Sequence, residues 1–191
     1  MIVIKNTNID YIILNNIKNL QIENVVIEKI NIINNKLQTL VIKDSLIIDL
    51  TDEDIFFKHL MNLFFLSITG SRINDITRID YNYLNNLEIL ILNNNNIEEI
   101  TNDTFKNLNK LKYLDLSYNL ITTIENKSFK DCSEICTIDL SFNKLKYLDK
   151  DLIKDLHFLR LFILLGNPKL LLTKNYFTNF IITGYYSVNN D

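Results

Sequence analysis

Alanine and tryptophan are absent from the 191 residues of this chain, which also holds only three glycines, one proline and two cysteines. Two cysteines cannot supply a disulfide framework, and the spacing of Cys132 and Cys136 is not that of a CxxC metal or redox motif. No apolar run approaches the roughly 20 residues that a membrane-spanning helix needs, and the first residues lack the basic and long apolar regions of a signal peptide. We therefore expect a soluble, cytoplasmic protein with reduced cysteines.

The abundant residue types indicate an internal repeat. The chain contains 31 Ile, 30 Leu and 29 Asn, which together are almost half of its length and are typical of a very AT-rich genome. A hydrophobic content of 47% is too high for a disordered protein, and a formal net charge of -3 lacks the basic excess of a nucleic-acid binder. The length fits a single domain with a substantial core.

The middle of the chain repeats with a fixed period, since the copies that begin at Leu87, Leu111, Ile135 and Leu159 are equally spaced. Apolar residues fall at positions 1, 4, 6 and usually 11 of each copy, and again near positions 14, 19 and 22. Position 9 is asparagine in all four copies: Asn95, Asn119, Asn143 and Asn167. Weaker copies begin near residues 63, 37 and 17, and a truncated copy opens the chain.

This LxxLxLxxN pattern resembles the leucine-rich repeat family in its typical 24-residue class. The resemblance implies an α/β solenoid of about eight coils over residues 1–169, with a curved parallel sheet on the concave face and short helices and turns on the convex side. The apolar residues 170–191 are interpreted as a capping segment, because the end of a solenoid otherwise exposes its core. The sequence 51–54 (TDED) predicts the start of one convex helix, which would carry Phe56, Phe57, Leu60 and Met61.

The residues themselves support this interpretation. Apolar residues at positions 4 and 6 alternate with an outward residue at position 5, as in a strand with one buried face. The position-9 asparagines would form a ladder whose amides satisfy buried backbone groups. Thr7, Val25, Ser45 and Ser71 occupy that position in the weaker copies, which predicts a less rigid N-terminal half.

No arrangement of residues indicates catalysis or metal binding. His59 and His157 fall in turns far apart in the stack, and no nucleophile, phosphate loop or acidic cluster has the required spacing. We therefore expect no enzymatic activity, no cofactor and no metal. Asp115 and Asp139 stack at position 5 of adjacent coils and could bind a cation or a basic side chain, although aspartate is also ordinary at this position of the family.

The outward residues of the strands form the candidate site. They are polar in the first coils and become apolar and aromatic from the fourth coil onward, which is the usual signature of a protein-binding surface. The core does not require them. The residues expected to contact a partner are Phe65, Ile89, Ile91, Tyr113, Asp115, Tyr118, Asp139, Phe142, Leu161 and Ile163.

The family resemblance implies non-enzymatic binding of a protein partner through the concave face, with no nucleic-acid and no membrane partner. The composition is similar to that of short leucine-rich repeat proteins of large insect DNA viruses, in which a host-protein inhibitor or decoy would be the natural role, and it equally fits a protist. The alternative is a structural homo-oligomer, such as a homodimer, assembled through the N-terminal edge strand.

Overall fold

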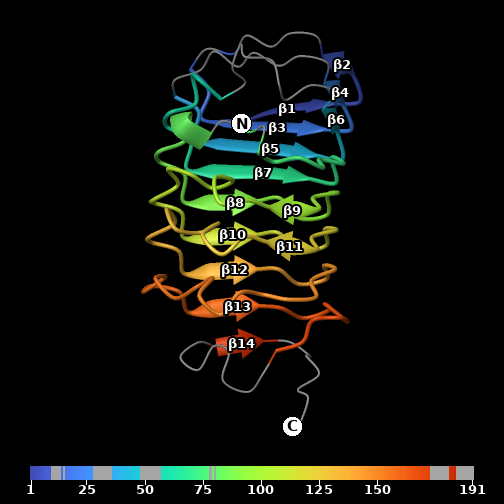
Figure 1. Cartoon of the computed structure of the whole chain (residues 1–191). Coiled ribbons are helices and arrows are strands. Elements are labelled where there is room, and N and C mark those ends of the chain that lie inside the picture. The colour runs from blue at the N-terminus through green and yellow to red at the C-terminus, as the bar shows by residue number, and fades with distance from the viewer. Residues whose placement is uncertain are drawn as a thin grey trace.

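Nine parallel strands, joined in chain order, form the main sheet of the protein (Figure 1). A computed structural model describes residues 1–9, 14, 16–27, 36–47, 57–77, 79, 81–172 and 181–183. The sheet strands are β1 (Ile2–Lys5), β3 (Asn19–Glu23), β5 (Thr39–Lys43), β7 (Phe65–Thr69), β8 (Ile89–Ile91), β10 (Tyr113–Asp115), β12 (Thr137–Asp139), β13 (Leu161–Ile163) and β14 (Ile181–Thr183). Each of the eight sequence copies therefore contributes one strand, which confirms the solenoid.

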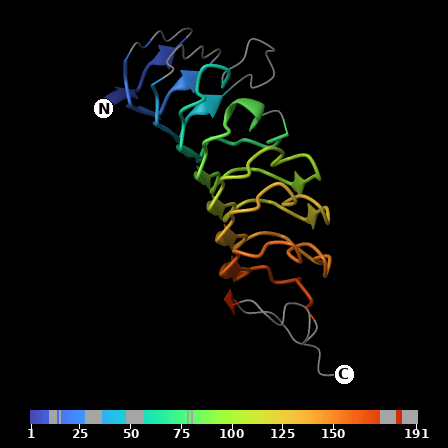
Figure 2. The ribbon, with the colours of Figure 1, turned by 90° about the vertical axis from the view of Figure 1, so that its left-hand side faces the viewer.

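The strand register follows the sequence repeat. Tyr113 lies opposite Ile89 on one side and opposite Thr137 on the other, so that each step along this part of the sheet equals one period of the sequence. The first coils are less regular, because the step from Leu20 to Leu40 is shorter than this period and the step from Leu40 to Leu66 is longer. Figure 2 shows the strands along the inner side of a curved stack and the return segments along its outer side.

The described part of the convex side carries short strands and turns where short helices were also expected. It carries two short parallel ladders. One consists of β2 (Asn8–Ile9), β4 (Val26–Ile27) and β6 (Leu46–Ile47), and the other pairs β9 (Glu99–Ile100) with β11 (Thr123–Ile124). The one helix in the described part of the chain is a 3-10 helix, η1 (Tyr81–Tyr83). The expected helix start at 51–54 and Phe56 lie outside the described residues, whereas Phe57 and the two residues after it form a turn.

The spacing of the apolar residues explains the lack of α-helix. Positions 19, 22 and 1 are three residues apart, and successive i to i+3 hydrogen bonds join them. Leu108 N donates to Phe105 O (3.4 Å) and Leu111 N donates to Leu108 O (3.1 Å). Residues that are spaced three apart all face inward only in a 3-10 geometry, because an α-helix has 3.6 residues per turn. The α component of the predicted α/β class is thus replaced by turns among the described residues.

The core is a set of columns that run along the stack. Leu90, Leu114, Ile138 and Phe162 at position 4 have no exposed surface. An aromatic column at position 19 consists of Tyr81, Phe105 and Phe129, with ring centroids 6.1 Å and 5.8 Å apart. No coil could bury these side chains by itself, and neighbouring coils therefore supply each other's core.

The sheet continues beyond the last recognisable repeat. Strand β14 pairs in parallel with β13, and Leu161 lies opposite Ile181. Leu170 and Leu172 also belong to the buried core. Both observations support the interpretation of 170–191 as a capping segment, which stays a proposal. None of the helical structure in the described residues is long and apolar enough to cross a membrane.

Candidate binding surface

The strands arrange the outward side chains in rows across the concave face. Residues at position 3 form one row, because Phe65, Ile89 and Tyr113 are register partners in turn and Leu161 follows after Thr137. All of them are half-buried, whereas the position-4 residues beside them are fully buried. The structure thus brings together Phe65, Ile89, Tyr113 and Leu161, with one threonine interrupting the row.

A second row, at position 5, is more polar. Ile91, Asp115, Asp139 and Ile163 are register partners in that order. Asp115 is only 8% exposed. Its carboxylate accepts hydrogen bonds from the backbone N and the Oγ of Ser117 (2.9 Å and 2.6 Å) and from Nδ2 of Asn93 (3.1 Å).

These contacts favour a structural role for Asp115 over the predicted partner contact. Asp139 accepts a hydrogen bond from Ser141 N at 2.8 Å, and it remains half-buried.

Burial, and then the negative charges of Asp115 and Asp139, raise the pKa of the nearby Tyr113. Its phenol therefore stays neutral at physiological pH and offers a hydrogen-bond donor on the concave face.

The four position-9 asparagines tie each coil to the preceding one. Asn119 Nδ2 donates to the carbonyls of Leu92, Leu116 and Ser117, and its Oδ1 accepts from Ile97 N (3.1 Å). Asn95, Asn143 and Asn167 make the same kinds of bond, and each is at most 5% exposed. A single amide thus satisfies four buried backbone groups, which explains its recurrence.

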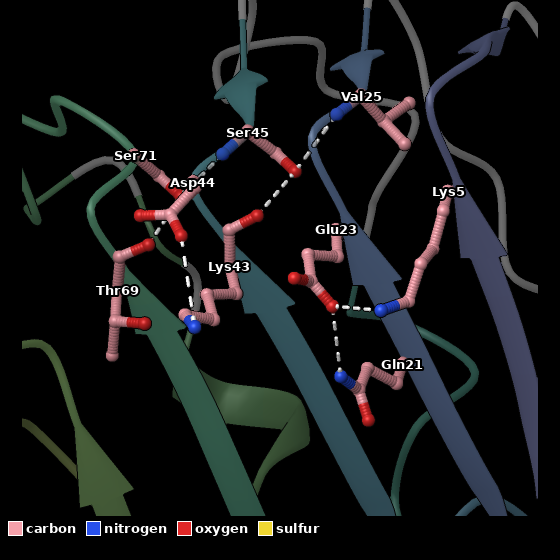
Figure 3. A network of polar contacts seen from close by, with 9 residues as sticks. All are labelled: Lys5, Gln21, Glu23, Val25, Lys43, Asp44, Ser45, Thr69 and Ser71. Atoms are coloured by element: carbon pink, nitrogen blue, oxygen red, sulfur yellow. Dashed lines mark hydrogen bonds and ion pairs between the residues drawn. The ribbon is translucent and has the colours of Figure 1, made fainter.

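Serine takes over this role in the N-terminal half (Figure 3). Ser45 Oγ donates to Lys43 O (2.8 Å) and accepts a hydrogen bond from Val25 N (3.2 Å). Ser71 Oγ donates to Thr69 O (3.0 Å). A hydroxyl satisfies fewer groups than an amide, and the inter-coil link is therefore weaker in this half.

The concave face of the first coils is polar and contains paired charges. Lys5 Nζ lies 2.6 Å from a carboxylate oxygen of Glu23, which also accepts a hydrogen bond from Gln21 at 3.3 Å (Figure 3). The hydrogen bond from Lys5 lowers the pKa of Glu23. The apolar rows begin only at β7, so that the two halves of the face differ in chemistry.

The sequence pattern was not used to predict a column of residues with left-handed backbone at position 8. The residue at position 8 of each of the eight coils has a positive φ, between 50° and 72°. Six of them are the residue types that tolerate this conformation, namely Asn6, Asn24, Asp44, Gly70, Asn94 and Gly166. The other two are Tyr118 and Phe142. The frequent Asn, Asp and Gly at position 8 could have revealed the column.

Tyr118 and Phe142 therefore lie at the rim of the concave face, three residues beyond the ends of β10 and β12. Their rings are stacked, with centroids 4.4 Å apart and an interplanar angle of 12°. They are 55% and 42% exposed, whereas the predicted contact residues within the strands are half-buried or buried. Among the predicted contacts, these two are the most accessible.

The described residues contain no cluster of three or more His, Cys, Asp or Glu side chains that could hold a metal ion. Cys132 is fully buried, and Cys136 is half-exposed with its Sγ 3.4 Å from the carbonyl of Glu134. His157 is exposed and His59 is half-buried in their turns.

Comparisons with known proteins place the fold. Residues 85–135 match the leucine rich repeat family. The solved structure of TLR13 in its complex with ssRNA13 is similar, with 23% identity, a TM-score of 0.60 and coverage of 83% of this chain and 30% of that chain. An internalin (InlF) from Listeria monocytogenes str. 4b F2365 is similar too, with 16% identity, a TM-score of 0.54 and coverage of 85% and 49%.

This chain spans less than half the length of either structure. No curated protein matches its sequence. The repeat in the sequence, the nine-stranded parallel sheet and the family match agree with one another. The chain therefore has the fold of a leucine-rich repeat solenoid, and its residues 85–135 match the repeat of that family.

Proposed function

We propose that the protein is a non-enzymatic binding module that holds a protein partner on the C-terminal half of its concave face. The observation that carries this proposal is the row of Phe65, Ile89, Tyr113 and Leu161, whose side chains point away from the core and remain partly exposed. Apolar outward residues with no role in the core indicate an interface. The similar structure of TLR13 supports a binding role, since it is a complex with ssRNA13.

A protein fits this face better than a nucleic acid. The rows from β8 to β13 present aliphatic and aromatic residues with two aspartates and no lysine or arginine within the strands. Phosphate backbones require clustered basic side chains. The finer part of this proposal is the role of a host-protein inhibitor or decoy from a large insect DNA virus, which the composition typical of an AT-rich genome supports.

The test is partner capture by a pair of variants. The double variant Tyr113→Lys and Leu161→Lys places charge in the apolar row, while Tyr113 already lies near two aspartates that can accommodate an ammonium group. Interface hot spots are worth about 2–4 kcal/mol each, so that two should reduce affinity by roughly three orders of magnitude. The thermal unfolding midpoint should change little.

The matched control is Lys106→Glu with Lys127→Glu, two exposed residues of the return segments. Partner proteins captured by the unchanged chain and identified by mass spectrometry should be lost from the concave variant and kept by the control. The reverse pattern would place the interface on the convex side and refute the proposal.

A second function is favoured by the N-terminal edge of the sheet. Strand β1 pairs with β3 on one side only, and Ile2 and Val3 are 37% and 41% exposed. An apolar edge strand is a template for a second copy of the chain. Light scattering of the protein and of Val3→Lys separates the cases, because a monomer in both rules out assembly through this edge.

A further inference from the structure

The stacked rings of Tyr118 and Phe142 occupy an unfavourable backbone conformation at the surface. Their φ values are 54° and 53°, in the left-handed region that bulky side chains avoid. Phe142 also covers Gly166, where an added Cβ would lie 2.5 Å from Cδ1 of the ring. The core does not use either ring, and strained residues of this kind concentrate at binding sites.

A basic pocket adjoins this aromatic pair. It has a volume of about 400 Å³ and is lined by Thr122, Asn143, Lys144, Lys146, Pro168 and Lys169. No carboxylate is among the described residues that line it. Within the described part of the chain, none of its three lysines forms an ion pair. Three ammonium groups around one hollow attract an anionic group.

The pocket and the rings face the same side of the solenoid. Position 9 points inward, as the buried Asn143 shows, and the exposed residues before and after it, Phe142 and Lys144, therefore point outward together. Pro168 follows Gly166 in the same way in the next coil. Aromatic and basic groups thus form one surface, which we call the flank: Tyr118, Phe142, Lys144, Lys146 and Lys169.

We propose that the flank binds an acidic segment of a protein partner, with its carboxylates at the lysine pocket and an apolar side chain against the two rings. This inference shares with the proposed function only the premise that the ligand is a protein. Charge complementarity selects an acidic segment. Single-stranded nucleic acid fits less well, because its bases need free ring faces, whereas Tyr118 and Phe142 cover each other and Phe142 covers Gly166.

The test uses a defined probe, a fluorescein-labelled acidic peptide composed of glutamate, tyrosine and leucine, and measures fluorescence anisotropy. We expect Lys144→Glu with Lys146→Glu to weaken binding at least tenfold. Tyr118→Asn with Phe142→Asn should weaken it at least tenfold as well. Asparagine is the residue found at position 8 in three other coils, so that the backbone should be retained.

The controls separate this proposal from its rivals. Lys106→Glu with Lys127→Glu makes the same change in net charge and should leave peptide affinity unchanged. Unchanged affinity in the asparagine variant would show simple charge attraction, and equal or tighter binding of labelled oligo-uridine would show a nucleic-acid site. No binding of the peptide to the unchanged protein would also refute the proposal.

Failure of the two proposals can be distinguished. Tyr113→Lys with Leu161→Lys should keep the affinity for the acidic peptide, because both residues lie in strands and not on the flank. If this variant loses the peptide while the flank variants keep it, the acidic segment binds the concave face and the flank proposal is wrong. Loss of partner capture alone, with peptide binding intact, leaves the flank proposal standing.

Discussion

At the scale of single residues, the side-chain amide of the position-9 asparagine joins neighbouring coils. Each position-9 asparagine is buried and links carbonyls and N–H groups of two coils, and its nearest asparagine neighbours have other roles. Asn93 is half-buried and donates to the carboxylate of Asp115. Asn96 is exposed. Residue type alone therefore does not identify the ladder, and its position in the repeat does.

Replacement of a ladder asparagine should destabilise the protein strongly. Asn119→Ala leaves the buried N–H of Ile97 without its partner, and it removes one of the two asparagine donors to each of the carbonyls of Leu92 and Leu116. We expect a loss of roughly 1–3 kcal/mol in the free energy of unfolding, because unpaired buried polar groups are costly. Urea denaturation followed by circular dichroism measures it.

The control for this substitution is Asn96→Ala, one coil away on the surface. A change within about 0.5 kcal/mol is expected there, as for most exposed sites. Asn93→Ala is unsuitable as a control, because it also removes the hydrogen bond to Asp115. Equal losses for Asn119→Ala and Asn96→Ala would contradict the ladder interpretation.

At the scale of elements, the return segments determine how the core is closed. Their inward residues at positions 19 and 22 include the fully buried Cys132 and Tyr81, which is 4% exposed and whose hydroxyl has no hydrogen-bond partner among the described residues. Burial, and secondarily Asp131, raises the pKa of Cys132 to about 12. Burial also raises the pKa of Tyr81. Both groups stay protonated in the folded protein at a pH where the unfolded chain loses its protons.

The protein should consequently lose stability in alkali. The unfolded chain binds fewer protons than the folded one above about pH 9, so that the free energy of unfolding falls as pH rises toward 12, by about 1.4 kcal/mol per pH unit for each such group. Cys132→Ala removes one of these groups and should reduce the slope by about that amount. Cys136→Ala, with a half-exposed thiol, should keep the full slope. Urea denaturation at pH 8 to 11 checks this, and equal slopes for both variants would contradict it.

At the scale of the whole molecule, the solenoid has two unlike halves. The first coils have strand steps of unequal length, serine links between coils and a polar concave face. From β8 through β13 the strand step is constant, the links are asparagine amides and the face is apolar. The proposed binding surface thus lies on the half that is linked by asparagine amides, where we expect little conformational freedom to be lost on binding.

Hydrogen exchange should reveal this difference. Because a repeat protein opens locally, the amides of β3 and β5 should exchange faster than those of β10 and β12. Ser45→Asn should slow exchange in β3 and β5 if the added amide completes the ladder, and mass spectrometry of peptides can follow each strand. Equal protection in both halves would show that the serine links are as effective as the asparagines.

The sequence by itself determined the repeat, its register and the direction of each strand residue. A coil cannot bury its own apolar edge, and therefore the recurrence of apolar residues at positions 1, 4, 6 and 11 admits only a stack of parallel strands. The same alternation predicts that Phe65, Ile89, Tyr113 and Leu161 face outward. The composition of the last residues also indicates that they cover the core, although it does not predict strand β14.

Tertiary structure alone decided the remaining features. Turns instead of helices close the described coils, because the return residues recur every three positions and neighbouring coils must stack about 4.8 Å apart. Asp115 is buried because Ser117 of its own coil and Asn93 of the preceding coil donate hydrogen bonds to its carboxylate. Tyr118 and Phe142 meet at the rim because every coil turns through a left-handed residue at the same place. The burial of Asp115 and the stacking of the two rings depend on contacts between coils, which the sequence of a single coil does not specify.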